Sequence, residues 1–161
     1  MVTELTKYAI PEGNSMKNGI YDIDASYGWL IGTASQQINQ RLTRTFAEHG
    51  LDITTEQWCL LVHLMNEDGL SQQELASRYM RSKVTVFKLI SLLEKKEFIY
   101  RVADPKDGRI KRVYLTNHAK EHQALMVRLA QENLAMAMRG CPEDQLDTLK
   151  ECLRAIIKNT K

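Results

Sequence analysis

The sequence lacks the features that mark a secreted or membrane-spanning protein. It has three cysteines in 161 residues and no CxxC pair, and such an odd, scattered set argues against a disulfide framework. No apolar run approaches the ~20 residues that cross a bilayer, and the first residues, MVTELTKYAIPEGNS, contain no signal-peptide core. We therefore predict a cytoplasmic protein without membrane contacts, in which Cys59, Cys141 and Cys152 are thiols packed in the core.

Internal repeats and low-complexity tracts are also missing, which excludes repeat architectures and long biased segments. The hydrophobic content of 43% and the charged content of 26% are typical of globular proteins. A chain of this length forms one compact core more readily than two. We predict a single domain over residues 1–161.

The net charge of +2 hides a strong segregation along the chain. Residues 78–112 contain 11 Lys or Arg and 4 Asp or Glu, a net charge of +7, whereas the remainder carries −5. A merely solvated surface usually mixes both signs, and a local field of one sign suits a polyanion. The charge pattern therefore predicts a nucleic-acid partner.

Both ends of the chain are predicted to be helical and amphipathic. Apolar residues recur every four positions from Leu30 to Phe46, which predicts a long helix over residues 21–49. A second long helix is predicted over residues 116–139, and a last helix follows the break at Gly140. Their apolar stripes are too extensive for one small module to cover, so we expect a two-fold dimer to bury them.

Two capping-box patterns place the helices between these ends. Thr54 with Gln57 opens a buried helix, and Ser71 with Glu74 opens a short one. A break at residues 80–82 separates this short helix from the next, which carries an apolar face and a polar, basic face. The pattern predicts two helices joined by a tight turn.

A β-hairpin is predicted directly after these helices. The runs FIYRV and IKRVYL are rich in strand formers, and the intervening ADPKDGR contains the turn formers Asp, Pro and Gly. Two short helices followed by a basic hairpin form a winged helix-turn-helix. We predict this DNA-binding part over residues 51–116, with Ser71–Leu115 gripping double-stranded DNA, flanked by helical dimerisation parts at 20–50 and 117–160.

Each piece of this module has a physical task on DNA. The second helix enters the major groove, the amides that open the first helix bind phosphate, and a basic wing follows the backbone toward the minor groove. Asp107 would be repelled by phosphate, so we expect it to orient the turn or Arg109 through a hydrogen bond. The predicted DNA-binding residues are Ser71, Gln72, Gln73, Ser82, Lys83, Thr85, Lys88, Lys106, Asp107, Arg109 and Lys111.

From Tyr21 to the C-terminus the sequence resembles the MarR (multiple antibiotic resistance) transcriptional regulators. DPKDGR followed by VYLT looks like that family's wing signature, and ELASRYMRSKVTVFKLISLLEKKEFI resembles its recognition-helix region. Met80 and Glu97 stand where the family commonly has glycine, and Val84 and Phe87 replace typical small polar residues. The resemblance implies a homodimer on a pseudo-palindromic operator, released by small ligands or oxidants.

We therefore predict a mainly α-helical winged helix-turn-helix protein with a two-stranded wing and long dimerisation helices. Its predicted function is that of a homodimeric transcriptional regulator, a repressor released by a small aromatic or phenolic effector, without catalytic residues, metal or cofactor. Five residues are predicted to line the effector pocket: Tyr27, Trp29, Trp58, His63 and Met65. Core packing is the competing interpretation for most of them.

Several alternatives stay open at this point. A winged helix also serves as a protein-interaction module, and fold alone does not choose between the two functions. His118, Glu121 and His122 match the HxxEH pattern of some zinc peptidases, but no third ligand is evident, and a regulatory metal that includes His49 is a separate hypothesis. Cys59 lies on an apolar helix face, where a packed thiol is favoured over an oxidant sensor.

Overall fold

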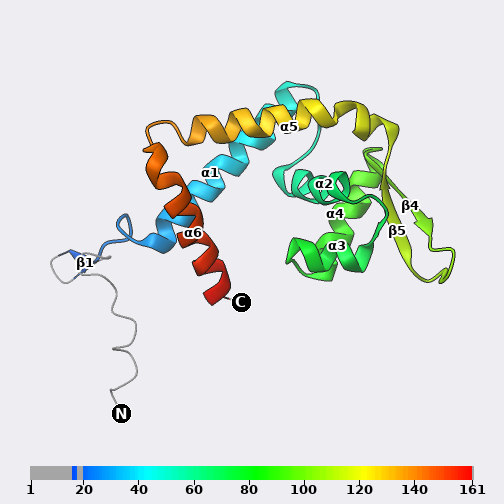
Figure 1. Ribbon diagram of the computed structural model, residues 1–161, viewed down its shortest axis with the longest axis horizontal. Coiled ribbons are helices and arrows are strands. Elements are labelled where there is room, and N and C mark those ends of the chain that lie inside the picture. The colour runs from blue at the N-terminus through cyan, green and yellow to red at the C-terminus, as the bar shows by residue number, and fades with distance from the viewer. Residues whose placement is uncertain (1–15, 18–19, 161) are drawn as a thin grey trace, which may run out of the picture.

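The computed structural model describes residues 16–17 and 20–160, in which six helices are accompanied by a small sheet at one end of the molecule (Figure 1). In chain order the elements are β1 (Met16–Lys17), β2 (Ile20–Tyr21), α1 (Tyr27–Glu48), α2 (Thr55–Asn66), β3 (Leu70–Ser71), α3 (Gln72–Tyr79), α4 (Lys83–Lys95), β4 (Ile99–Ala103), β5 (Lys111–Leu115), α5 (Asn117–Ala137) and α6 (Glu143–Asn159). The predicted fold class, a mainly α-helical winged helix-turn-helix, is confirmed.

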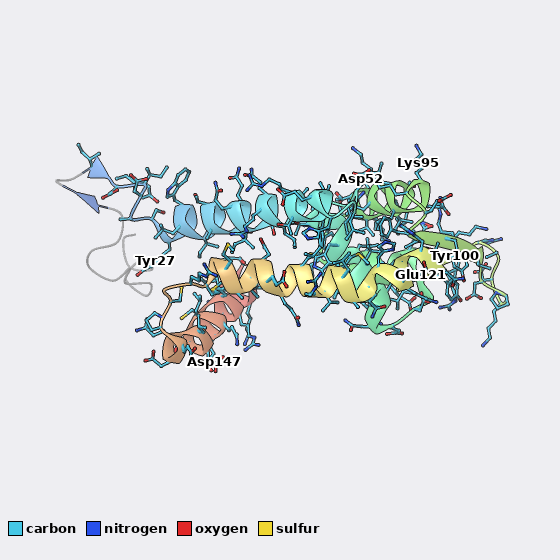
Figure 2. All side chains as sticks on the ribbon, turned by 90° about the horizontal axis from the view of Figure 1, so that it is seen from above. Tyr27, Asp52, Lys95, Tyr100, Glu121 and Asp147 are labelled. Atoms are coloured by element: carbon cyan, nitrogen blue, oxygen red, sulfur yellow. The ribbon has the colours of Figure 1, made fainter. Side chains whose placement is uncertain are left out.

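Helices α1 and α5 lie side by side and connect the two ends of the molecule (Figure 2). Where they meet, the amide of Asn133 donates a hydrogen bond to the carbonyl of Ile38, at 3.2 Å. Helix α6 turns back from the end of α5 (Figure 1), and none of its residues is buried. Within the described residues, the amphipathic helix α6 therefore packs against little of the protomer.

The predicted start of the first long helix, Tyr21, is wrong by six residues. Tyr21 belongs to β2, which pairs with β1, and the helix begins at Tyr27 after Ser26 in an extended conformation. The misprediction arose because the regular apolar spacing begins only at Leu30, and nothing upstream of it fixed the boundary. The predicted end is right, since Gly50 follows the helix with φ +76°.

Both capping boxes form as predicted. The Thr54 hydroxyl accepts from the N–H of Gln57 at 3.3 Å, and the Gln57 side chain accepts from the N–H of Thr54 at 3.0 Å. Ser71 and Glu74 exchange the same two bonds at 3.1 and 2.7 Å. These bonds pair amide groups that every helix N-terminus leaves without an intrahelical acceptor.

Two residues adopt a left-handed conformation that glycine favours. Met80 ends α3 with φ 53° and ψ 36°, and Glu97 lies between α4 and β4 with φ 59°. A side chain at such a φ costs about 1–2 kcal/mol through the clash of Cβ with the following carbonyl. At both positions the MarR resemblance implies glycine. The left-handed backbone conformation found there explains that preference.

The predicted two-stranded hairpin of the wing, β4 and β5, forms and is extended to a three-stranded sheet by β3. β5 pairs antiparallel with β4 through five residue pairs, from Ile99 with Leu115 to Ala103 with Lys111, and on its other edge with β3. A Cβ on Gly69, which precedes β3, would lie 2.7 Å from the Tyr114 ring. Only glycine fits there, and it lets the chain enter the sheet directly before α3.

The hydrophobic core fills the space between α2, α3, α4 and the sheet. It extends along the C-terminal end of α1 and the N-terminal part of α5. The rings of Phe46 and Trp58 join α1 to α2, with centroids 5.7 Å apart. The prediction that all three cysteines pack in the core is wrong, because Cys141 and Cys152 are exposed and Cys59 is half-buried. Both exposed cysteines belong to α6 and its preceding turn, which pack against little of the protomer.

Across the described residues, no helix combines the length and the apolar composition that crossing a bilayer requires. Residues 1–15, on which the prediction of a missing signal peptide was made, lie outside the described part.

Candidate nucleic-acid interface

Helix α4 presents an apolar face to the core, as predicted, and its solvent face carries the basic and polar residues together with Val84 and Phe87. Val86, Leu89, Ile90 and Leu93 are buried, whereas Lys83, Thr85 and Lys88 are exposed. Ser82 caps the helix: its hydroxyl accepts from the N–H of Thr85 at 3.2 Å and lies 2.8 Å from the Thr85 hydroxyl. Two of the predicted DNA-reading hydroxyls are therefore bonded to each other in this conformation.

The start of α3 leaves two backbone amides available. The capping box uses the N–H groups of Ser71 and Glu74, and those of Gln72 and Gln73 lie in the first turn, where no carbonyl precedes them in the helix. The hydrogen bond from the Ser71 backbone lowers the pKa of Glu74, so that its carboxylate stays ionised and holds the cap. An anion that approaches Gln72 and Gln73 meets these amides and the helix dipole.

The tip of the wing is organised by two aspartates. Asp107 accepts a hydrogen bond from the backbone N–H of Arg109 at 3.0 Å, and so orients the turn that carries Arg109. Asp104, which sequence reasoning missed, accepts from the N–H groups of Lys106 and Asp107 at 2.7 and 3.1 Å. Its side chain is mostly buried beneath the turn, with 7% exposed.

Arg112 connects the wing to the segment before α3. Its guanidinium pairs with the Asp104 carboxylate and also donates to the carbonyl of Gly69 at 3.0 Å. The backbone bond from Lys106, the bond from Arg112 and the bond from Asp107 together lower the pKa of Asp104. The sequence signal for the role of Asp104 is its position directly before a proline. An Asp at the start of a turn commonly accepts hydrogen bonds from the backbone N–H groups two and three residues later.

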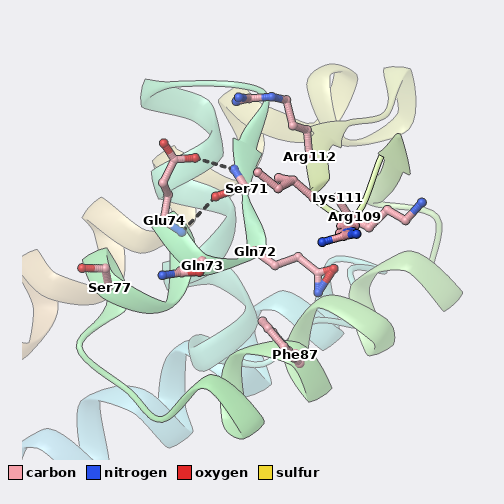
Figure 3. A pocket seen from close by; sticks show the side chains of 10 residues that line it. Ser71, Gln72, Gln73, Glu74, Ser77, Phe87, Arg109, Lys111 and Arg112 are labelled. Carbon is pink, nitrogen blue, oxygen red and sulfur yellow. Dashed lines mark hydrogen bonds between the residues drawn. The ribbon is translucent and has the colours of Figure 1, made fainter. Parts of the chain in front are cut away.

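A groove of about 590 Å³ opens between the start of α3, helix α4 and the wing (Figure 3). The residues that line it are Ser71, Gln72, Gln73, Glu74, Ser77, Phe87, Arg109, Ile110, Lys111 and Arg112. Five of the eleven predicted DNA-binding residues line this groove, and Ser82, Lys83, Thr85, Lys88, Lys106 and Asp107 lie beyond its lining on α4 and the wing tip. The structure thus brings side chains from three separate segments to one concave surface.

The basic residues of the module divide into paired and unpaired groups. Arg78, Arg101 and Arg112 form ion pairs with Glu67, Glu94 and Asp104. Among the described residues, no ion pair involves the five predicted DNA-binding cations: Lys83, Lys88, Lys106, Arg109 and Lys111. The charge that stays available to a ligand is therefore concentrated on α4 and the wing.

The five residues predicted to form an effector pocket do not come together in one protomer. Tyr27 and Trp29 are exposed at the start of α1, whereas Trp58 packs against Phe46 near the end of that helix. A rise of 1.5 Å per residue separates the two places by roughly 28 Å, and Tyr27 lies far from the wing in Figure 2. The sequence did not reveal this separation, because residue type alone says nothing of distance along a helix.

The other two pocket candidates, His63 and Met65, are half-buried on α2. The His63 ring meets the edge of Tyr79, with centroids 6.4 Å apart. Burial, and secondly the charge of Arg78, lowers the pKa of His63, so the ring is held neutral.

Among the residues that the structure describes, the histidines of the HxxEH motif and Cys59 are in contact with residues of the fold rather than with a metal-binding or redox-active group. The rings of His118 and Phe98 pack together with centroids 4.9 Å apart. The Nδ1 atom of His122 lies 2.9 Å from the carbonyl oxygen of His118. Within residues 16–17 and 20–160, no three His, Cys, Asp or Glu side chains are grouped to hold a metal ion. Burial raises the pKa of Cys59, which is the opposite of the lowered value that a reactive thiolate requires.

Comparison with known proteins places the module in a family. The sequence model of the MarR family matches residues 53–111, which include α2, α3, α4 and most of the wing. Among curated relatives, the uncharacterized HTH-type transcriptional regulator YybA of Bacillus subtilis is 27% identical over 109 residues, covering 68% of this chain and 73% of that protein. The regulator SarZ of Staphylococcus aureus is 27% identical over 92 residues, covering 57% of this chain and 61% of its own length.

Solved structures extend the similarity to the long helices. The transcriptional regulator SlyA superimposes with a TM-score of 0.74 at 27% identity, over 81% of this chain and 91% of that chain. The Staphylococcus aureus MepR–DNA complex gives a TM-score of 0.74 at 25% identity, over 86% of this chain and 99% of that chain. The likeness therefore covers α1 and α5 as well as the winged module.

Proposed function

Because this chain belongs to the MarR family of transcriptional regulators, we propose that it binds a pseudo-palindromic operator in double-stranded DNA as a homodimer. We propose further that it represses transcription until a small effector releases it, and that residues 1–161 form one domain. The observation that carries the proposal is the set of unpaired cations around the groove between α3, α4 and the wing.

The arrangement of this surface suits duplex DNA. A single α-helix fits the major groove, and the exposed face of α4 carries Lys83 and Lys88 at the end that would enter first. The free amides of Gln72 and Gln73 supply a phosphate contact on one side. On the other side the wing carries Arg109, and an arginine suits the negative potential of a narrow minor groove.

The dimer is supported by apolar surface that the protomer leaves open. Trp29 and Leu30 on α1 and Ile156 and Ile157 on α6 are 42–51% exposed. A 17-residue helix with none of its residues buried has little to stabilise it in water, since tertiary packing supplies most helix stability. A second copy related by a two-fold axis would cover these residues and present two copies of α4 to two half-sites.

Effector release is the third part of the proposal. We place the effector site on the side of α2 where His63 and Met65 are half-buried, since a neutral imidazole beside apolar groups suits a small aromatic or phenolic compound. A thermal-shift screen of such compounds tests it, because a ligand that binds the native state raises its melting temperature. Failure of every aromatic compound to raise that temperature would contradict this part alone.

The DNA-binding part is tested by measuring affinity for the DNA upstream of the protein's own gene at several salt concentrations. We expect tight binding that weakens steeply with salt, and weaker binding to a shuffled duplex of equal length and composition. An affinity that hardly changes with salt, or that is equal for both duplexes, would contradict the proposal. In that case the protein-interaction module becomes the better interpretation of the same surface.

A further inference from the structure

Helix α4 carries an apolar side chain where solvent surrounds it. Val84, the second residue of the helix, is 80% exposed, more than any other large hydrophobic residue in the described part of the chain. Phe87 follows three residues later on the same side of the helix and is 40% exposed. Neither belongs to the buried face formed by Val86, Ile90 and their neighbours.

No feature of the protomer accounts for valine at this position. A β-branched residue loses side-chain freedom in a helix, so an exposed valine gains nothing from local propensity. The polar side chains next to it are engaged, since the hydroxyls of Ser82 and Thr85 bond to each other. Lys83 and Val84 are the side chains of the first turn of α4 that make no such bond and extend into solvent.

We propose that Val84 determines operator sequence by contacting the C5-methyl group of a thymine, with Phe87 covering the contact from the groove side. Thymine is the base that presents an apolar group in the major groove. Lys83 and Lys88, on either side of Val84 in sequence, carry charge suited to hold this end of α4 against phosphates. Phe87 lines the groove beneath Gln72 and beside the wing (Figure 3), where it excludes water from the contact.

The surroundings favour DNA over a protein as the occupant of this apolar patch. A protein-docking patch is usually rimmed by mixed polar groups, whereas the charged residues that flank Val84, namely Arg81, Lys83 and Lys88, are all basic. The inference rests on the proposed DNA binding and makes it specific.

The test compares thymine with deoxyuridine, which lacks only the C5-methyl group. The 161-residue protein is used to select a duplex from a random-sequence library, and each thymine of that duplex is then replaced in turn. In each half-site we expect one thymine whose replacement weakens binding about fourfold. This is the factor expected when one methyl or methylene group is buried. Replacement elsewhere should change the affinity much less.

The matched variants assign this effect to the side chain. In Val84→Ala the sensitivity to deoxyuridine should fall below about twofold at that position, because the two changes remove the same contact. Val84→Ile should retain it. Val102→Ala, which truncates a 46% exposed valine on β4, should behave as the wild type. Thermal melting confirms that each variant is folded.

The outcomes separate this inference from the function on which it rests. Salt-dependent, sequence-specific binding that no deoxyuridine replacement weakens overturns the role of Val84 and leaves DNA binding standing. Equal deoxyuridine sensitivity in the wild type and Val84→Ala also overturns it. If no duplex is selected at all, both proposals fall, and Val84 with Phe87 is then better explained as a protein-docking patch.

Discussion

Arg109→Ala gives the sharpest test of how the wing contributes to binding. The backbone N–H of Arg109 is bonded to Asp107, and the turn is held further by Asp104, so truncating the side chain leaves the hairpin in place. The substitution then removes one of the five predicted DNA-binding cations of each protomer, none of which forms an ion pair with another described residue. In the proposed dimer, eight of ten cations remain.

The expected magnitude follows from counterion release. The logarithm of affinity falls with the logarithm of salt concentration with a slope of about −0.9 for each neutralised phosphate. If every one of these cations contacts a phosphate, the wild-type dimer has a slope of about −9 and the variant a slope of about −7. Between 50 and 200 mM salt the wild type then loses roughly 10⁵-fold in affinity and the variant roughly 10⁴-fold.

Fluorescence anisotropy of a labelled operator, titrated at five or more salt concentrations, measures both slopes. Arg139→Ala is the matched control, because Arg139 is an exposed arginine at the end of α5, far from the wing. We expect this control to keep the wild-type slope. An Arg109→Ala slope equal to that of the wild type would refute a phosphate or minor-groove role for Arg109, whatever happens to the affinity at one salt concentration.

Three further predictions follow from the fold. Met80→Gly should raise the free energy of unfolding in urea by about 0.5–1 kcal/mol. Relief of about 1–2 kcal/mol of left-handed strain exceeds the stability lost through the entropy that glycine adds to the unfolded chain. Gly50→Ala, at φ +76°, should lower the free energy of unfolding. Because its hydrogen bonds lower the pKa of Asp104, the stability that this carboxylate contributes is present above the ordinary value of 3.8 and is lost as pH falls through the lowered pKa. The wild type should therefore be more stable than Asp104→Asn at pH 7, and this difference should shrink at pH 3; a difference of the same size at both pH values would contradict it. Ile156→Glu should yield monomers in light scattering and weaken operator binding, and an intact dimer would place the interface away from α6.

Local sequence signals predicted most of the helix and strand boundaries. Thr54 and Ser71 mark helix starts because a hydroxyl followed by Gln or Glu three residues later satisfies amides without help from distant residues. The wing turn was predicted for the same reason, since Asp, Pro and Gly restrict the backbone locally. Elements determined by neighbours in sequence are thus visible in the sequence.

Features determined by distant residues were missed. β3 is two residues long and exists because it pairs with β5, more than 40 residues later, so no periodicity marks it. The bond from Arg112 to the carbonyl of Gly69 spans 43 residues and likewise leaves no local pattern. The sequence likewise did not show that Tyr27 and Trp58 are separated by most of the length of α1.

The hydrogen bonds that were missed bear on how an effector can release DNA. Arg112 ties the wing to the segment that opens α3, and Thr116 ties the start of α5 to the loop after α4 by donating to the carbonyl of Glu97 at 2.6 Å. At the other end, the Thr55 hydroxyl donates to the carbonyl of Asn39 at 2.7 Å, which joins α2 to α1.

We expect a module bonded in this way to both long helices to move with them as a unit. In the proposed dimer, a movement of one protomer against the other would therefore change the separation of the two copies of α4 without unfolding either. Since half-sites lie one helical turn of DNA apart, a change of a few ångströms in that separation is enough to remove one recognition helix from its groove. In the proposed release, hydrogen exchange of the α4 amides should therefore stay unchanged when effector binds, and increased exchange there would contradict rigid-body release.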